Sequence, residues 1–297
     1  MKAPTPLIEG DTIAIISPAG ALRETSVVGV CKVILEKWGL KVVVMPHTLT
    51  KKGYYSGTVD ERMDDLLHSL LDNDIKAILC SYGGYGCVHL LKDFAPLIKE
   101  HPKWIVGMSD CSALHAACQS QGVMSIHSSQ CNHLSKFPDS IPSKMLKQIL
   151  FGKTHEYQNI PHILDIYGEA TGKLVGGNLT VLTALIGTEY DIFKEGTILF
   201  IEDTGEQPYR IERMMYQLEL SGALSRINGL IVGQFTGIKE NSEFGEPYEL
   251  IHNIVKRYEI PTCFGFPVGH FDDNVPLIEG AEYRLKVNAD GTVLMNI

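Results

Sequence analysis

The sequence predicts an α/β protein: an N-terminal doubly wound parallel sheet with a nucleophile-elbow-like turn, followed by a second, mixed α/β domain. Five strand-like runs alternate with helical patterns in the first half of the 297 residues. One of these repeats, Trp104 to Gln121, has the pattern of a strand, a sharp turn and a helix, with Ser109 at the bend. A less regular stretch then separates this half from further strands and helices. Such alternation implies parallel strands joined by right-handed crossovers.

Each element of the first half is a short β-prone run or a helical pattern that ends at turn residues. Helices are predicted over 24–38, 60–71, a short segment after the glycines at 83, 84 and 86, and 111–118. Strands are predicted over 12–17, 41–45, 75–80, 104–106 and 124–127. Ligands of such sheets bind at the carboxyl ends of the strands, where we expect Ser109 and the glycine loop 81–86.

The stretch 136–167 contains three prolines and few long apolar runs, so we predict a linker with one short helix near 143–150. Residues 1–135 then form the N-terminal domain, which carries Ser109, and residues 168–297 form the C-terminal domain. The C-terminal domain is expected to hold helices at 178–186, 209–220 and 247–258 and strands at 171–175, 197–201, 229–233, 283–287 and 292–296. Asn-Ala-Asp-Gly at 288–291 predicts a hairpin between the last two strands.

The composition is that of an ordinary globular protein, with 44% hydrophobic and 21% charged residues. A net charge of −9 argues against a nucleic-acid partner. Seven cysteines without a CxxC pair predict reduced thiols in a cytosol rather than a disulfide framework or a zinc site. The first seven residues contain no apolar signal region, and no run of about 18 apolar residues is present to cross a membrane. We therefore expect a soluble, cytoplasmic protein without a membrane partner.

Ser109 is the first candidate for chemistry. The backbone N–H groups that open the following helix point toward a hydroxyl at this bend, and the positive end of the helix dipole suits an anion or a developing oxyanion. The geometry resembles the nucleophile elbow of α/β hydrolases but lacks that motif's second glycine. The alternative is that Ser109 is a helix N-cap, because serine is a preferred capping residue.

An acid and a histidine in the second half can complete this chemistry. Glu202 ends the apolar strand 197–201, where a carboxylate can orient a histidine. The alternative is a solvated loop acid, and both Asp203 and Glu206 compete for the orienting role. His270 lies in a loop rich in glycine and proline, where a histidine is either a surface residue or a general base, because its pKa lies near neutral pH. Serine, acid and histidine together are the groups that acyl transfer needs.

The glycine loop 81–86 is suited to an anion. Its glycines allow φ > 0 and close approach of the backbone to a ligand, so its N–H groups can bind an anion or oxyanion. It lacks the Lys-Ser/Thr of a P-loop and the full G-x-G-x-x-G spacing, which makes nucleotide binding the weaker interpretation. His127, Cys131 and His133 do not have a familiar zinc spacing. We expect neither a metal nor a cofactor.

Seven motifs occur in order along nearly the whole chain. They are Gly-Asp-Thr-Ile-Ala-Ile-Ile-Ser-Pro-Ala-Gly at 10–20, Ser-Tyr-Gly-Gly-Tyr-Gly at 81–86, Gly-Met-Ser-Asp at 107–110, Gly-Gly-Asn-Leu-Thr at 176–180, Phe-Ile-Glu-Asp at 200–203, Pro-Tyr-Arg-Ile-Glu-Arg-Met at 208–214 and Phe-Pro-Val-Gly-His at 266–270. Together they resemble the LD-carboxypeptidase family, serine peptidases that trim murein peptides in the cytoplasm. Relatives of that family include the microcin C self-immunity proteins.

The resemblance implies a Ser-Glu-His triad split across the two domains. Ser109 is then the nucleophile, Glu202 rather than Asp203 the orienting acid, and His270 the base. The implied reaction is hydrolysis of an L–D peptide bond, with release of the terminal D-alanine from a murein tetrapeptide.

The resemblance also implies an oxyanion hole formed by the N–H of Asp110 and one N–H of the glycine loop, expected at Gly84. A carboxypeptidase must bind the terminal carboxylate as well. Arg210 and Arg213 are candidates by charge, although helical arginines more often form surface ion pairs. We expect a small peptide as the partner and allow for a homodimer.

This chain departs from the family pattern at two places. Cys111-Ser112 stands where a bulky apolar residue and threonine are usual, and Ser128-Ser129 stands where Gly-Pro is common. Neither departure touches the triad, but both can reshape the pocket. The runner-up function is a microcin-immunity-like hydrolase of peptidyl or aminoacyl nucleotides. A third interpretation is a non-catalytic small-molecule binding module, against which the intact Ser109, Glu202 and His270 argue.

Overall fold

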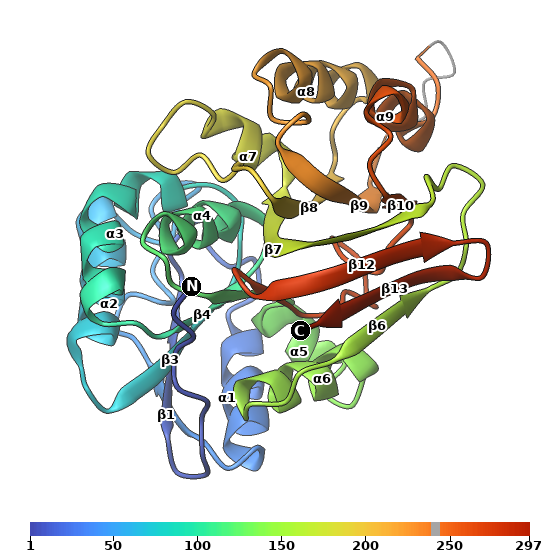
Figure 1. The fold of residues 1–297 in the computed structure, drawn as a ribbon. Helices are drawn as coiled ribbons and strands as arrows, with labels where there is room; N and C mark the ends of the chain where they lie inside the picture. The colour runs from blue at the N-terminus through green and yellow to red at the C-terminus, as the bar shows by residue number, and fades with distance from the viewer. Residues whose placement is uncertain (239–243) are drawn as a thin grey trace. The chain divides into compact units, whose positions relative to one another are not determined.

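The structure, a computed structural model, describes residues 1–238 and 244–297 in two compact units. The first unit comprises Met1–Thr154 and the short segment Val275–Glu279, and the second comprises His155–Asn274 and Gly280–Ile297. Each unit is built on one sheet (Figure 1). Within the described ranges, no helix has the length and apolar character needed to cross a membrane.

The first unit contains a six-stranded sheet in the order β11–β5–β4–β3–β1–β2. Five strands run parallel, and β11 pairs antiparallel to β5 at one edge. Most side chains of the parallel strands are buried, as expected for a sheet covered on both faces. The strands are β1 (Thr12–Ile16), β2 (Lys41–Val44), β3 (Ile75–Cys80), β4 (Trp104–Gly107), β5 (Ser125–His127) and β11 (Leu277–Glu279).

The helices of the first unit pack in two groups (Figure 1). One group is α1 (Ser26–Lys37) with α5 (Cys131–Lys136), after which α6 (Ile141–Leu150) follows in the chain. The other is α3 (Leu91–Glu100) with α2 (Val59–Leu71) and α4 (Ser112–Ser120). α2 begins with a capping box, because Thr58 and Glu61 each accept a hydrogen bond from the other's backbone N–H. The predicted α/β fold with a parallel sheet is confirmed.

The second unit contains a seven-stranded mixed sheet in the order β10–β9–β8–β7–β12–β13–β6. β7 to β10 run parallel, whereas β12, β13 and β6 pair antiparallel. Helix α8 packs against both α7 and α9. The elements are β6 (Glu156–Asn159), β7 (Gly168–Asn178), α7 (Leu179–Ala184), β8 (Thr197–Thr204), α8 (Pro208–Leu220), β9 (Ile227–Thr236), α9 (Pro247–Val255), β10 (Thr262–Phe264), β12 (Glu282–Asn288) and β13 (Gly291–Asn296).

The sequence prediction misses several short elements, and the strands β7, β8 and β9 are longer than predicted. Three strands of three or four residues (β6, β10 and β11) and helix α5 are not predicted. Segments this short carry too few residues to show a hydrophobic period. Residues 136–167, predicted as a linker, hold α6 and β6 and are divided between the two units after Thr154.

Candidate functional site

Ser109 sits at a strained turn after β4. β4 ends at Gly107, Met108 is extended, and Ser109 has φ +64° before one 3₁₀ turn leads into α4. Among the described non-glycine residues, only Ser109 and Glu259 have φ in the left-handed region. Such strain persists only where the surroundings impose it, and it is common at functional sites. No side-chain capping bond is present at the start of the 3₁₀ turn or of α4, so the N-cap interpretation of Ser109 is wrong.

Buried groups behind the turn hold it in place. A Cβ on Gly107 would lie 3.0 Å from the Cβ and Sγ of Cys111 and 3.1 Å from the Cβ of Cys80, so glycine permits the tight bend. The Gly107 carbonyl accepts hydrogen bonds from the His115 Nε2–H and the Ser128 N–H, both at 2.9 Å. The backbone is therefore positioned without help from the Ser109 side chain.

The glycine loop 81–86 lies directly against Ser109. A Cβ on Gly83 would lie 2.7 Å from the Cβ of Ser109 and 2.9 Å from its Oγ. On its other side the loop meets the turn after β1, where the Gly20 N–H donates to the Gly83 carbonyl at 2.9 Å. Gly84 has φ +97°, and a Cβ there would lie 3.1 Å from the Cα of Gly20. The loop packs so closely on Ser109 and on Gly20 that both Gly83 and Gly84 must be glycine. The backbone of the loop therefore lies next to the Ser109 hydroxyl.

The buried side chain of Arg62 anchors the far end of this loop. Its exposure is 2%, and its Nη1 donates to the carbonyls of Gly86 at 2.9 Å and Pro18 at 2.6 Å. Its Nε donates to the Thr58 carbonyl at 3.3 Å, and its Nη2 lies 3.1 Å from the Nδ1 of His89. One guanidinium therefore ties together the turn after β1, the glycine loop and the start of α2.

Asp110, which follows Ser109, holds the glycine loop from the elbow side. Its carboxylate accepts a hydrogen bond from the Cys87 N–H at 2.7 Å. Burial raises the pKa of Asp110 to about 6, although backbone hydrogen bonds oppose the shift. A Cβ on Gly83 would lie 3.5 Å from the Asp110 nitrogen, so this N–H also borders the loop.

Glu202 and His270 form a hydrogen-bonded pair in the second unit. Glu202 lies near the end of β8 and is fully buried, and its Oε2 accepts from the His270 Nδ1–H at 2.7 Å. The histidine loop is held by the Gly269 N–H, which donates to Asn274 at 2.8 Å, and by the Thr236 hydroxyl, which donates to the His270 carbonyl at 3.2 Å. A Cβ on Gly269 would lie 3.1 Å from the Cβ of Glu202, so a side chain there would push the pair apart.

The carboxylate controls the protonation of the histidine. Burial alone would lower the pKa of His270, but the charge and hydrogen bond of Glu202, with the charge of Asp203, raise it above its ordinary value. Because Nδ1 is bonded to the carboxylate, Nε2 is the nitrogen left for proton transfer. The His270 side chain is 23% exposed, which leaves the ring accessible.

Asp203 has a structural role that differs from that of Glu202. Its carboxylate accepts from the Asn178 amide, from the N–H and hydroxyl of Thr180, and from the Thr204 N–H, at 2.8 to 3.0 Å. These donors lie at the start of α7 and on β8 itself. Four donors occupy this acid, so Glu202 and not Asp203 is the partner of the imidazole.

The structure therefore groups the candidate residues in two places. Ser109, Asp110 and the glycine loop lie together in the first unit, and Glu202 lies with His270 in the second. Arg62 is not found from the sequence, where it appears only as a charged helical position. Gly83, which packs against Ser109, is the neighbour of the predicted Gly84. The pair of adjacent glycines in the sequence is the feature that could have indicated it.

The two arginines considered as carboxylate anchors have local partners. The Nη1 of Arg210 lies 3.4 Å from Glu206, and the guanidinium of Arg213 lies 5.3 Å from the ring centroid of Tyr209. Arg210 thus forms a surface ion pair, which was the alternative expected from the sequence, whereas Arg213 contacts an aromatic ring.

One group in the described residues has the spacing of metal ligands: His47, Asp64 and Asp65 in the first unit. The N–H and Nδ1 of His47 already bond the Asp65 carboxylate at 3.0 to 3.2 Å, so hydrogen bonding accounts for this geometry. We assign no ion to it.

Comparison with known proteins extends over most of the chain. Residues 13–128 match the model of the LD-carboxypeptidase N-terminal domain, and residues 171–285 match that of the LD-carboxypeptidase C-terminal domain. The chain is 32% identical to a probable murein peptide carboxypeptidase of Bacillus subtilis (strain 168), over 94% of this chain and 90% of that protein.

Two solved structures have the same fold. The crystal structure of muramoyltetrapeptide carboxypeptidase from Oxalobacter formigenes superposes with a TM-score of 0.86 at 27% identity, covering 95% of this chain and 97% of that one. The microcin C7 self-immunity protein MccF superposes with a TM-score of 0.85 at 25% identity, covering 99% and 98%.

We expect the pKa of His270, followed by NMR of its ring, to lie above the ordinary histidine value of about 6.5. Glu202→Gln should lower it, because an amide has no charge to stabilise the imidazolium. A raised histidine pKa adds stability that is present below about pH 6.5 and is lost as the pH rises through the raised value. The pH dependence of unfolding should have this sign and should weaken in the variant.

The control is Glu195→Gln, which removes an exposed carboxylate of the same unit and should leave the His270 pKa unchanged. A pKa below the ordinary value, or one that Glu202→Gln does not move, would contradict the role assigned to the pair.

Proposed function

Because the chain belongs to the LD-carboxypeptidase family of serine peptidases, we propose that it hydrolyses the L–D peptide bond of a murein tetrapeptide and releases the terminal D-alanine. The names of the Bacillus subtilis and Oxalobacter formigenes proteins support this substrate class. We also propose a cytoplasmic location, for which seven buried, free cysteines are suited. The homodimer stays a prediction.

The proposed mechanism assigns Ser109, Glu202 and His270 to one triad. The Nε2 of His270 takes the proton of the Ser109 hydroxyl as its Oγ attacks the scissile carbonyl, and an acyl-enzyme forms when that proton passes to the leaving D-alanine amine. Water then attacks the acyl-enzyme carbonyl while His270 takes a proton from it. His270 returns that proton to the Ser109 Oγ as the tripeptide leaves. Glu202 holds the imidazole tautomer and stabilises the imidazolium.

The oxyanion of each tetrahedral intermediate needs donors that are already in place. We assign these donors to the N–H groups of Asp110 and Gly84. The close packing of the glycine loop on Ser109, and the anchoring of that loop by Arg62 and Asp110, support the assignment.

The observation that carries the proposal is the 2.7 Å hydrogen bond from the His270 Nδ1 to the buried Glu202. It presents a histidine with one nitrogen oriented and the other free, which is the arrangement that a general base in acyl transfer needs. The strained, partly exposed Ser109 is independent support.

A second candidate is hydrolysis of a peptidyl or aminoacyl nucleotide. It is favoured by the likeness to the microcin C7 self-immunity protein and by exposed aromatic rings beside the glycine loop. Tyr54 and Tyr85 are 61% and 49% exposed, and a Cβ on Gly84 would lie 3.5 Å from the Tyr54 hydroxyl. Such rings can stack on a base. The third interpretation, a non-catalytic binding module, conflicts with membership of a peptidase family.

Three substitutions separate the proposed roles. Ser109→Ala should lower kcat on murein tetrapeptide by about 10⁴-fold or more, and Glu202→Gln by about 10²- to 10⁴-fold, because each removes a member of one catalytic unit. Asp203→Asn should leave kcat within about tenfold but cost roughly 1–3 kcal/mol of stability, because four donors lose their ionised acceptor. Alanine release is followed by mass spectrometry, and stability by urea unfolding. If Glu202→Gln leaves kcat unchanged and Asp203→Asn abolishes it, the orienting acid is Asp203 and our assignment is wrong.

Arg62→Lys tests whether the loop anchor supports the oxyanion site. Lysine cannot reproduce the several donors of a guanidinium, so the loop backbone should shift. We expect kcat to fall by about 10- to 100-fold with a much smaller change in KM, because oxyanion donors act on the transition state. Arg23→Lys, at an exposed position, is the matched control. A rise in KM with unchanged kcat would assign Arg62 to substrate binding instead.

The chirality of the terminal residue tests the substrate. A tetrapeptide that ends in D-alanine should be cleaved at least about 100-fold faster than the all-L analogue. Inversion exchanges the methyl group and the carboxylate in a fixed pocket and leaves a buried charge unpaired. Amidation of the terminal carboxylate should also slow cleavage. Equal rates on both epimers would reject the stereospecific pocket, and cleavage of a peptidyl nucleotide alone would favour the second candidate.

A further inference from the structure

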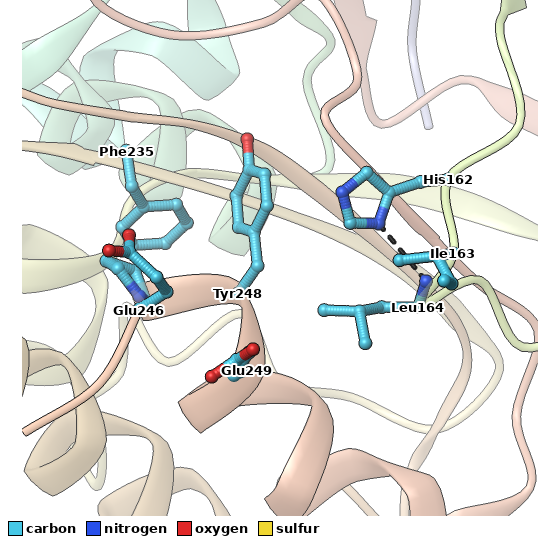
Figure 2. A pocket seen from close by; sticks show the side chains of 8 residues that line it. His162, Ile163, Leu164, Phe235, Glu246, Tyr248 and Glu249 are labelled. Carbon is cyan, nitrogen blue, oxygen red and sulfur yellow. Dashed lines mark hydrogen bonds between the residues drawn. The ribbon is translucent and has the colours of Figure 1, made fainter.

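The second unit contains a hollow of about 410 Å³ that takes no part in the proposed chemistry. It lies between the end of β9, the start of α9 and the segment after β6. Its lining comprises residues 162–164, Phe235 and residues 246–249 (Figure 2). Glu202 and His270 are not among them. A hollow of this size accommodates a group as large as an amino-acid side chain with part of its backbone.

Hydrogen bonds fix one wall of the hollow. The Leu164 N–H donates to the Nδ1 of His162 at 3.2 Å, which is the dashed line in Figure 2. The Asp165 carboxylate accepts from the N–H groups of His162 and Phe264, both at 2.9 Å. The segment that carries His162 is thus held to β10. A ligand would meet a wall that is already formed, which lowers the entropy cost of binding.

Aromatic rings form most of the remaining lining. The ring of Tyr248 lies between Phe235 and His162 (Figure 2), with centroids 6.4 Å and 5.5 Å away. The Tyr248 hydroxyl donates to the Gly233 carbonyl at 2.9 Å and is therefore already used. These rings offer their faces and edges to a ligand, and an aromatic face attracts a cation.

The charged groups of the hollow are all carboxylates. Both Glu246 and Glu249 line the hollow, and Figure 2 draws the Glu249 carboxylate below Tyr248. Both glutamates are exposed, and neither forms an ion pair with any residue of the described chain. The lining residues include no lysine or arginine. The Nδ1 of His162 is already occupied, because it accepts the hydrogen bond from the Leu164 N–H.

The helix start does not reverse this charge preference. The first turn of a helix favours negative charge, and Glu249 in the first turn of α9 already supplies it. An anionic ligand would meet two carboxylates, whereas a cation would meet both carboxylates and the aromatic faces.

We propose that this hollow is a binding site for an organic cation, an alkylammonium or guanidinium group on an apolar chain, such as the side chain of a basic peptide. The apolar chain would lie against Leu164 and the rings, and the charged end would pair with Glu246 and Glu249. The site does not include Glu202 or His270, and its proposal does not rest on the proposed reaction.

The test uses three probes of one shape on the full-length protein: butylammonium, 1-butanol and butyrate. Saturation-transfer NMR and calorimetry should show binding of butylammonium at millimolar concentration, weaker binding of butanol and none of butyrate. Added salt should weaken the butylammonium complex, because exposed charges are screened. Butanol bound as tightly as butylammonium, preferred binding of butyrate, or no butylammonium signal would each overturn the proposal.

The variant Glu246→Gln/Glu249→Gln should weaken butylammonium binding by about five- to twentyfold, the loss expected for two exposed ion pairs. The matched control Glu195→Gln/Glu282→Gln removes two exposed carboxylates of the same unit and should leave binding unchanged. If both variants weaken butylammonium binding equally, the loss comes from the change in net charge of the protein, and the proposed site is refuted. Circular dichroism checks the fold, and if the double variant unfolds, the probe comparison on the unmodified protein decides.

Discussion

The buried carboxylate of Glu202 is the constraint on which the second unit's site depends. An unpaired charge inside a protein costs several kcal/mol, and removing one partner of a buried pair leaves that cost in place. The His270 Nδ1–H donates to Oε2 of Glu202, while Oε1 has no hydrogen-bond partner within the described chain. Rotation of the imidazole away from Glu202 would therefore leave the buried carboxylate without its hydrogen-bond donor. Gly269 and Asn274 shape the loop so that the ring reaches the carboxylate.

Two neighbouring acids on β8 acquire opposite roles because strand geometry separates them. Successive side chains of a strand point to opposite faces, and the pairing of β8 with β9 shifts between Ile201 and Asp203. Such an irregularity re-aims side chains and is common beside active sites. Asp203 consequently receives four donors around α7, whereas Glu202 receives the imidazole. One acid stabilises the fold, and the other is available for chemistry.

In the first unit, the main constraint is on Ser109, which is held at a positive φ that serine disfavours. A non-glycine residue in the left-handed region costs on the order of 1–3 kcal/mol and must be over-determined by its surroundings. Close packing of Gly83, the carbonyl contacts of Gly107 and the glycine-loop anchors Arg62 and Asp110 supply that constraint. The same contacts place loop backbone beside the serine hydroxyl. Strain and preorganisation therefore have one cause.

The sequence by itself determined the strand–helix alternation, the hairpin at 288–291 and the motifs around Ser109, Glu202 and His270. These features are local, because hydrophobic period and turn residues act over a few positions. Spacing alone left Asp203 as a rival acid and did not reveal Arg62. Only the tertiary structure decided these points, and it also added β11 beside β5. The physical reason is that a hydrogen-bond partner or an edge-strand neighbour is set by where the packed chain brings distant groups, such as Arg62 and Gly86.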